Sequence, residues 1–164
     1  MNVYFITGTS GSGKTTLTHY LKEKLPKTFF EIYDFDENGV PPNADKAWRQ
    51  KTTDYWLQKA QENSVNNKST VICGISVPSE ILGSSKKPNL PIYFGFIKIS
   101  DEIIKQRLQE RNWNEQLIQD NINWAHYLES EVKKQKHSLI VDSSLHINPE
   151  QTAHEFIKWI DTLP

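Results

Sequence analysis

A glycine-rich segment that directly follows a short apolar run constrains this chain more than any other feature. Val3–Thr7 is apolar and rich in residues that favour β-strands. The next eight residues, Gly8–Thr15, match the pattern G-x-x-x-x-G-K-[ST] at every position. Leucines then recur every fourth residue from position 17 to position 25, a spacing that is typical of a helix. The sequence therefore predicts a strand, a glycine-rich turn and a helix in direct succession.

A loop of this composition is suited to binding the phosphates of a nucleoside triphosphate. Glycine permits unusual backbone angles, so main-chain N–H groups can turn towards phosphate oxygens, and the following helix adds its positive N-terminal end. Lys14 is predicted to neutralise the β- and γ-phosphates, and the Thr15 hydroxyl to ligate Mg²⁺. ATP with Mg²⁺ is therefore the expected ligand. The residues predicted to bind it in this segment are Gly8, Thr9, Ser10, Gly11, Ser12, Gly13, Lys14, Thr15 and Thr16.

Strand and helix patterns alternate along the rest of the chain. This alternation predicts an α/β fold with a parallel sheet and helices on both faces. The likeness of Gly8–Thr15 to the P-loop motif implies one P-loop NTPase domain over residues 1–164, with five strands in the order 2-3-1-4-5. The expected strands are Val3–Thr7, Phe29–Tyr33, Ser69–Cys73, Ile92–Ile99 and Ser138–Val141. The expected helices are Lys14–Leu25, Ala44–Glu62, Asp101–Glu110, Asn114–Gln135 and Pro149–Leu163, with Asn63–Lys68 breaking the second and Pro78–Pro91 forming a loop or short helix.

The charge balance narrows the classes of partner. The 19 basic and 20 acidic residues leave a formal net charge of −1, whereas a dedicated nucleic-acid binder carries a basic excess. No stretch approaches the roughly 20 apolar residues that span a bilayer, and the first residues lack the features of a signal peptide. The single cysteine, Cys73, cannot form an internal disulfide. We expect a cytoplasmic protein, monomeric or homodimeric, that binds a small molecule and neither nucleic acid nor membrane.

Two carboxylates follow the second predicted strand. Asp34 and Asp36 are separated by one residue. Because ligands collect outside the carboxyl ends of parallel strands, the pair should face the same crevice as the glycine-rich loop. One carboxylate can hold Mg²⁺ through water, and the other can orient or deprotonate an acceptor hydroxyl. We therefore interpret the pair as part of a site rather than as a solvated acidic turn.

The order of these motifs resembles that of the shikimate kinase and gluconate kinase group, in the nucleoside-monophosphate-kinase-like branch of P-loop proteins. The resemblance rests on the glycine-rich loop, on Asp34 and Asp36, and on Gly74 at the end of the third strand. It implies that Asp34 serves the metal and that Asp36 contacts the substrate hydroxyl. Trp48-Arg49 is similar to a family motif whose arginine binds the acid group of the substrate. The resemblance thus implies substrate contacts for Arg49 and Gly74.

Two arginines lie on the helix predicted after the fourth strand. Arg107 and Arg111 are four residues apart, so they share one face of that helix. The matching region of the family carries lid arginines that close over the transferred phosphate, a task that suits the permanently charged fork of arginine. The resemblance implies a short lid near residues 107–114, with Arg107 binding the nucleotide and Arg111 acting in catalysis. Asp142–Ser144 either borders the adenine ring of the nucleotide, as the matching loop does in related kinases, or forms a simple turn between strand and helix.

These predictions favour an ATP-dependent small-molecule kinase that transfers the γ-phosphate to a hydroxyl of an unidentified metabolite. Lys14, Asp36 and Arg111 are the predicted catalytic residues. One alternative is a nucleoside or nucleotide (monophosphate) kinase, in which Arg49 binds the acceptor phosphate. Another is a regulatory P-loop ATPase that transfers phosphate only to water. The presence of only three arginines favours a hydroxyl acceptor, and the third strand lacks the aspartate typical of such ATPases.

Overall fold

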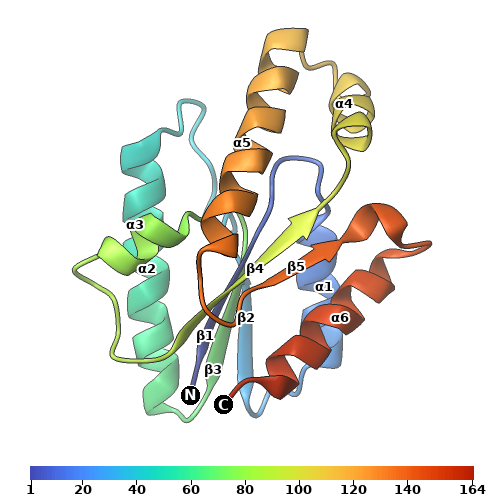
Figure 1. The fold of residues 1–164 in the computed structure, drawn as a ribbon. Coiled ribbons are helices and arrows are strands. Elements are labelled where there is room, and N and C mark those ends of the chain that lie inside the picture. The colour runs from blue at the N-terminus through green and yellow to red at the C-terminus, as the bar shows by residue number, and fades with distance from the viewer.

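The computed structural model describes residues 1–164 and contains a five-stranded parallel sheet (Figure 1). The strands lie in the order β2-β3-β1-β4-β5, so the predicted order is confirmed. Every neighbouring pair is parallel, as connections through helices allow. The strands are β1 (Val3–Thr7), β2 (Phe30–Asp34), β3 (Ser69–Cys73), β4 (Ile92–Lys98) and β5 (Leu139–Asp142). The helices are α1 (Lys14–Lys24), α2 (Lys46–Val65), α3 (Pro78–Gly83), α4 (Asp101–Gln109), α5 (Glu115–Lys133) and α6 (Pro149–Thr162), with a short 3-10 turn at Ser143–Leu145.

Side-chain alternation along the central strand β1 divides the apolar residues into two cores. Tyr4 and Ile6 belong to a buried cluster that includes residues of α1 and α6. Val3 and Phe5 belong to a second buried cluster, which includes residues of α2, α3 and α5. Because helices cover both faces, β1 and β3 are buried at every position. The predicted coverage of both faces of the sheet is therefore confirmed.

Helices α4 and α5 form a hairpin, residues 101–133, whose tip extends beyond the carboxyl ends of the strands (top of Figure 1). A third apolar cluster, which includes Ile104, Leu108 and Ile118, joins the two helices. This small core holds the hairpin together away from the sheet. None of the helices is both long enough and apolar enough to span a bilayer.

Capping side chains mark the first residues of two helices. Ser100 precedes α4, and its hydroxyl accepts a hydrogen bond from the backbone N–H of Ile103 at 3.3 Å. Asn148 precedes α6 and forms a reciprocal capping box with Gln151. Such caps satisfy N–H groups that have no partner within the helix. Both helices consequently begin immediately after the capping residue.

The end of α2 differs from the prediction. We expected Asn63–Lys68 to break this helix, but the helix continues to Val65 and Asn63 is buried within it. The amide of Asn63 donates to the Thr70 hydroxyl at 3.0 Å and thereby ties α2 to β3. This tertiary contact overrides the usual preference of asparagine for turns. In the expected loop 78–91, residues 78–83 form the short helix α3.

Gly74, which follows β3, lies where a side chain has no room. A Cβ built there would lie 2.0 Å from the Cβ of Phe35 and 3.2 Å from its Cα. Phe35 is fully buried, so it cannot move without disturbing the core. We expect Gly74→Ala to lower the free energy of unfolding by about 1–3 kcal/mol, measured by urea denaturation.

Gly83→Ala is the matched control for this prediction. A Cβ at Gly83, in the last turn of α3, would meet no atom within 4 Å. We expect its free energy of unfolding to change by about 0.5 kcal/mol or less. Equal unfolding midpoints for the two variants would contradict the packing argument.

Candidate functional site

The glycine-rich loop joins the carboxyl end of β1 to the N-terminus of α1, beneath the α4–α5 hairpin (Figure 1). Gly11 and Gly13 have φ angles of 81° and 95°, in the left-handed region that glycine adopts without strain. Gly13 is also the N-cap residue of α1 and provides no side-chain cap. The first N–H groups of α1 are therefore available to a ligand. Such a helix N-terminus with a glycine loop is suited to an anion.

One side-chain oxygen inside the loop lacks a partner. Ser12 is 2% exposed, and its hydroxyl makes no hydrogen bond within the protein. The hydroxyl packs against Gly8, where a Cβ would come within 2.5 Å of it. A buried hydroxyl without a partner costs free energy, so a ligand oxygen that accepted its hydrogen bond would be stabilised. The residues present thus fit a phosphate group.

The Lys14 side chain folds back onto the loop. Its ammonium Nζ donates a hydrogen bond to the backbone carbonyl of Thr9 at 2.7 Å. Burial lowers the pKa of Lys14 to about 8, and the nearby carboxylates of Asp36 and Asp34 oppose this effect. Because the ammonium is poorly solvated, its attraction to an anion in the loop is stronger than it would be in water.

The carboxylates of Asp34, the last residue of β2, and of Asp36 lie against the loop. The Thr15 hydroxyl donates to Oδ2 of Asp34 at 3.2 Å, and Oδ1 of Asp34 accepts from the backbone N–H of Asp36 at 3.0 Å. Burial and the neighbouring Asp34 raise the pKa of Asp36, while Lys14 opposes the rise. Carboxylate and hydroxyl oxygens are the ligands that Mg²⁺ prefers. No group of three or more His, Cys, Asp or Glu side chains forms a complete metal cage, so Mg²⁺ held here would complete its shell with phosphate oxygens and water.

Two adjoining cavities run along the loop. The first has a volume of about 260 Å³ and includes Asp34, Asp36 and Ile75 in its lining. The second, of about 280 Å³, includes Arg107 and Ser143. An elongated site of this kind can hold a chain of phosphates together with its nucleoside. The residues that line both cavities are Gly11, Gly13, Thr16 and Arg111.

The two predicted lid arginines occupy different positions. Arg107, near the end of α4, donates from Nη1 to the backbone carbonyl of Gly11 at 2.6 Å. Arg111 lies in the turn between α4 and α5 and lines both cavities. Arg107 thus holds the loop itself, whereas Arg111 faces the space beside it. Ser143, from the segment after β5, also lines the second cavity, so that segment borders the site.

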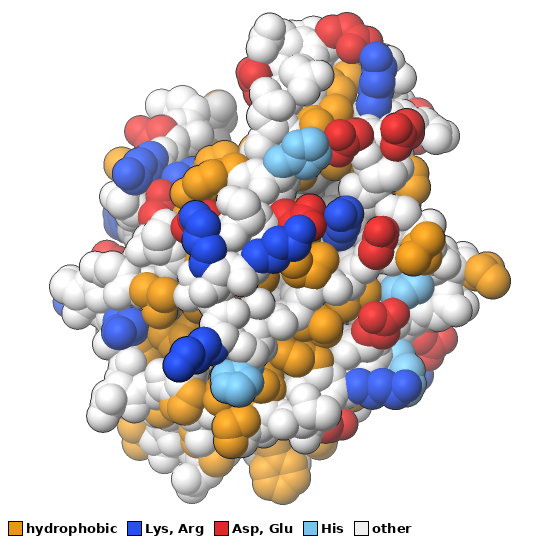
Figure 2. Space-filling view, viewed as in Figure 1, with side chains coloured by type: hydrophobic (Ala, Val, Ile, Leu, Met, Phe, Trp, Pro, Cys, Tyr) orange, Lys and Arg blue, Asp and Glu red, His pale blue; other side chains and the backbone are white.

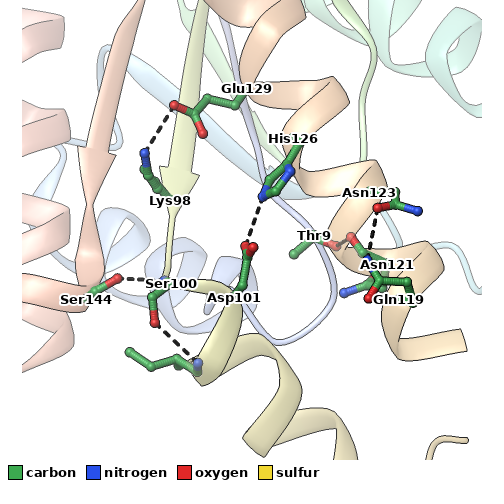
Figure 3. A network of polar contacts seen from close by, with 11 residues as sticks. Thr9, Lys98, Ser100, Asp101, Gln119, Asn121, Asn123, His126, Glu129 and Ser144 are labelled. Carbon is green, nitrogen blue, oxygen red and sulfur yellow. Dashed lines mark hydrogen bonds and ion pairs between the residues drawn. The ribbon is translucent and has the colours of Figure 1, made fainter. Parts of the chain in front are cut away.

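Helix α5 contributes a loop contact that the sequence motifs did not indicate. The backbone carbonyl of Asn121 accepts a hydrogen bond from the Thr9 hydroxyl at 3.1 Å. Its side-chain amide donates to the carbonyl of Ser10 at 3.3 Å. Figure 3 shows Thr9 beside Asn121. Because 112 residues separate these two positions and no motif marks α5, no sequence signal pointed to this contact.

Two further polar contacts join the hairpin to the sheet and its two helices to each other (Figure 3). Lys98, at the end of β4, pairs with Glu129 of α5 at 3.3 Å. His126 of α5 lies 2.9 Å from the carboxylate of Asp101 at the start of α4. On the face drawn in Figure 2, acidic and basic side chains are intermixed, in keeping with the near-zero net charge. The hairpin is therefore anchored both to the loop and to β4.

Two residues predicted to contact substrate lie outside the lining of both cavities. Arg49 donates from Nε and Nη2 to the carboxylate of Glu80 at 2.8 and 2.7 Å. Gly74 packs against Phe35, and this packing alone explains a glycine at that position. Substrate contacts of Arg49 and Gly74 stay predictions.

The Asn121 contact predicts an effect on nucleotide affinity. We expect Asn121→Ala to raise the Kd for ATP about tenfold, because the loss of one hydrogen bond of about 1.4 kcal/mol loosens the loop at Ser10. Isothermal titration calorimetry measures this Kd. Asn123→Ala is the control, since exposed Asn123 bonds only to Gln119 of its own helix. Equal affinities in the two variants would rule out a role of Asn121 in positioning the loop.

Comparisons with known proteins agree with this geometry. The model of a family described as AAA domain matches residues 5–134. The guanylate kinase of Helicobacter pylori (strain ATCC 700392 / 26695) is 55% identical over 31 residues, which are 19% of this chain. The match spans 15% of the length of that guanylate kinase.

Solved structures with the same fold extend over almost the whole chain. A sugar kinase from Janibacter sp. HTCC2649, solved without ligand, has a TM-score of 0.63 at 17% identity, covering 100% of this chain and 96% of its own. Shikimate kinase from Aquifex aeolicus vf5 has a TM-score of 0.59 at 20% identity, covering 98% and 96%. Shikimate kinase from Acinetobacter baumannii, in complex with shikimate, has a TM-score of 0.62 at 15% identity, covering 99% and 95%.

At these identities the likeness shows the fold, and it confirms the resemblance to this group of kinases. The family match begins in β1 and ends just after α5, so it contains the glycine-rich loop, the carboxylate pair and the hairpin that holds the loop. This protein therefore belongs to the AAA domain family of P-loop proteins.

Proposed function

We propose that this protein is an ATP-dependent kinase that transfers the γ-phosphate to a hydroxyl group of a small molecule. The observation that carries the proposal is the position of Asp36, which lines the same cavity as Lys14, Thr15 and Asp34. A hydroxyl that attacks a phosphate held by the loop needs such a carboxylate nearby. The fold shared with shikimate and sugar kinases gives further support.

The loop forms the donor half of the proposed site. Its amides and Lys14 neutralise the phosphates, and the Ser12 hydroxyl adds a hydrogen bond. Thr15 and Asp34 would hold Mg²⁺, which when bound would neutralise phosphate charge. Phosphoryl transfer asks little covalent chemistry of the protein, so positioning and charge stabilisation account for most of the catalysis.

Asp36 and Arg111 form the part of the proposed site where the acceptor hydroxyl reacts with the γ-phosphate. The acceptor oxygen forms a bond to the γ-phosphorus while the bond from that phosphorus to the bridging oxygen breaks and ADP leaves. The proton of the hydroxyl passes to Asp36, whose pKa is raised by burial and by Asp34 and which is therefore a better base than an ordinary carboxylate. Arg111 lines the cavity and stabilises the charge on the transferred group.

A nucleoside monophosphate kinase is the second candidate. The short match to the guanylate kinase of Helicobacter pylori favours it. We expect an acceptor nucleotide to need several arginines, however, and the chain contains only three. Of these, Arg107 bonds to Gly11 and Arg49 bonds to Glu80. A hydroxyl acceptor accounts better for this arrangement.

A coupled ADP-release screen tests the proposed function. Nucleosides, nucleotides, sugars, hydroxy acids and aminoglycosides are each added to the protein with ATP and Mg²⁺. The rate of ADP release is compared with the rate that the protein shows when water is the only acceptor. A hydroxyl compound that raises ADP release well above the background supports the kinase. Release of inorganic phosphate at an enzymatic rate without any acceptor supports the ATPase instead.

Asp36→Asn tests the catalytic carboxylate. We expect kcat for the best acceptor to fall by about 10²- to 10⁴-fold, because the amide cannot take the proton of the hydroxyl. The Kd for ATP should stay within about twofold, because the loop and Lys14 supply the main phosphate contacts. Glu23→Gln removes a carboxylate from the exposed side of α1 and serves as the control. An unchanged kcat in Asp36→Asn would exclude Asp36 as the base.

The lowered pKa of Lys14 predicts weaker ATP binding at alkaline pH. Below about pH 8 the ammonium is charged, whereas above it the free protein loses the charge and must take up a proton on binding phosphate. We expect the Kd for ATP to rise about tenfold between pH 7 and pH 9, measured by calorimetry in two buffers of different ionisation enthalpy. Lys14→Arg keeps its charge over this range, so its profile should be flat. A flat profile for the native protein would contradict the assigned role.

A further inference from the structure

We infer that His146 is a positioning residue that makes one wall of the nucleotide site accept hydrogen bonds rather than donate them, and that the site thereby favours adenine over a 6-oxopurine. The inference rests on the donor half of the proposed function. Four side chains carry it, in a continuous chain of hydrogen bonds that ends at the second cavity along the loop: Glu155, His146, Thr152 and Ser143.

The second cavity is the end of the site that suits the nucleoside. The first cavity includes Asp34 and Asp36, so in the proposed reaction it takes the γ-phosphate and the attacking hydroxyl. Both cavities border the glycine-rich loop, and the phosphates would follow the loop from one cavity to the other. The lining of the second cavity includes Ser143 and Thr152. The nucleoside of a bound triphosphate would therefore meet these two hydroxyls.

Each link of the hydrogen-bond chain is short. Nε2 of His146 lies 2.7 Å from the Glu155 carboxylate, and Nδ1 lies 2.8 Å from the Thr152 hydroxyl. The hydroxyls of Thr152 and Ser143 are also 2.8 Å apart. The His146 side chain is 12% exposed and Thr152 is 4% exposed, so water competes little for these bonds. The protein itself thus decides how the protons are arranged.

The number of protons fixes the direction of every bond in this chain. A carboxylate only accepts, so Nε2 of His146 carries a proton. Nδ1 of a neutral imidazole then accepts, and the single proton of the Thr152 hydroxyl goes to it. The Thr152 oxygen is left to accept from Ser143, whose single proton is used in turn. Ser143 therefore presents lone pairs to the cavity and no donor.

A fixed acceptor of this kind distinguishes between bases. A ribose hydroxyl can either donate or accept, so it fits a wall of either polarity. The 6-amino group of adenine only donates, whereas the 6-oxo group of a 6-oxopurine only accepts. Against the Ser143 oxygen, the amino group makes a hydrogen bond, while the oxo group leaves two acceptors facing each other. The chain therefore favours ATP over inosine triphosphate.

Titrations of the native protein with ATP and with inosine triphosphate test the inference. Calorimetry is performed with Mg²⁺, without an acceptor, at about pH 7.5, where histidine is ordinarily neutral. We expect the Kd for inosine triphosphate to be about tenfold higher than the Kd for ATP. Equal values would overturn the inference and leave the kinase intact. If ATP itself does not bind, the donor half of the proposed function fails.

Glu155→Gln tests the origin of the chain. The new amide can donate to Nε2 of His146, so Nδ1 can carry the proton and Ser143 can become a donor. We expect the ratio of the Kd for inosine triphosphate to the Kd for ATP to fall about threefold or more, because inosine triphosphate binds more tightly. A general loss of structure would weaken both nucleotides and could not produce this gain. Glu150→Gln removes an equal charge from α6, where Glu150 pairs with Lys24, and should leave the ratio unchanged.

His146→Phe tests the positioning residue directly. The variant has no ring nitrogen to accept the Thr152 proton, so that proton can go to Ser143 and free the Ser143 hydroxyl to donate. We expect the same ratio to fall about fivefold or more. His154→Phe changes an exposed histidine on the same helix and serves as the control. A native ratio in both Glu155→Gln and His146→Phe would exclude this chain as the determinant of base preference.

Discussion

The hydrogen bond between the Lys14 ammonium and the Thr9 carbonyl is the interaction around which the rest of the site is arranged. It holds the ammonium in a partly buried position, where burial lowers the pKa of Lys14. The same environment raises the pKa of Asp36 through burial and repulsion from Asp34. The Lys14 cation and the partly buried Asp36 carboxylate, whose pKa values shift in opposite directions, thus line one cavity. This combination suits a reaction in which a phosphate is held while a proton is removed from its attacker.

The geometry of the loop depends on distant parts of the chain. Arg107 of α4 bonds to Gly11, and Asn121 of α5 bonds to Ser10 and Thr9. Any movement of the hairpin relative to the loop would have to break these hydrogen bonds. The position of the hairpin and the shape of the phosphate site are therefore coupled, and the ion pair between Lys98 and Glu129 adds a link to the sheet. A single ion pair that is still partly open to solvent contributes little, so the loop contacts matter most.

Structures that share this fold include shikimate kinases and a sugar kinase, at 13–20% identity. Such a likeness preserves the sheet and the phosphate loop, because the backbone of the loop does the binding. It does not identify the acceptor, because one fold can host sites for many different substrates. In this protein the arginine that resembles an acid-binding residue is held by Glu80.

The sequence by itself determined the features that depend on local patterns. The motif Gly8–Thr15, the apolar run before it and the alternation of elements predicted the loop and the parallel sheet, because backbone conformation and burial follow from neighbouring residues. The strand order was implied by the resemblance to P-loop proteins. Asp34 and Asp36 could be placed at the same edge because strand ends coincide in a parallel sheet. Only the tertiary structure decided which partners the remaining side chains have. Asn121 reaches the loop from 112 residues away, and Arg49 meets Glu80 from 31 residues away. Such pairings arise from the packing of whole helices, which no local spacing records.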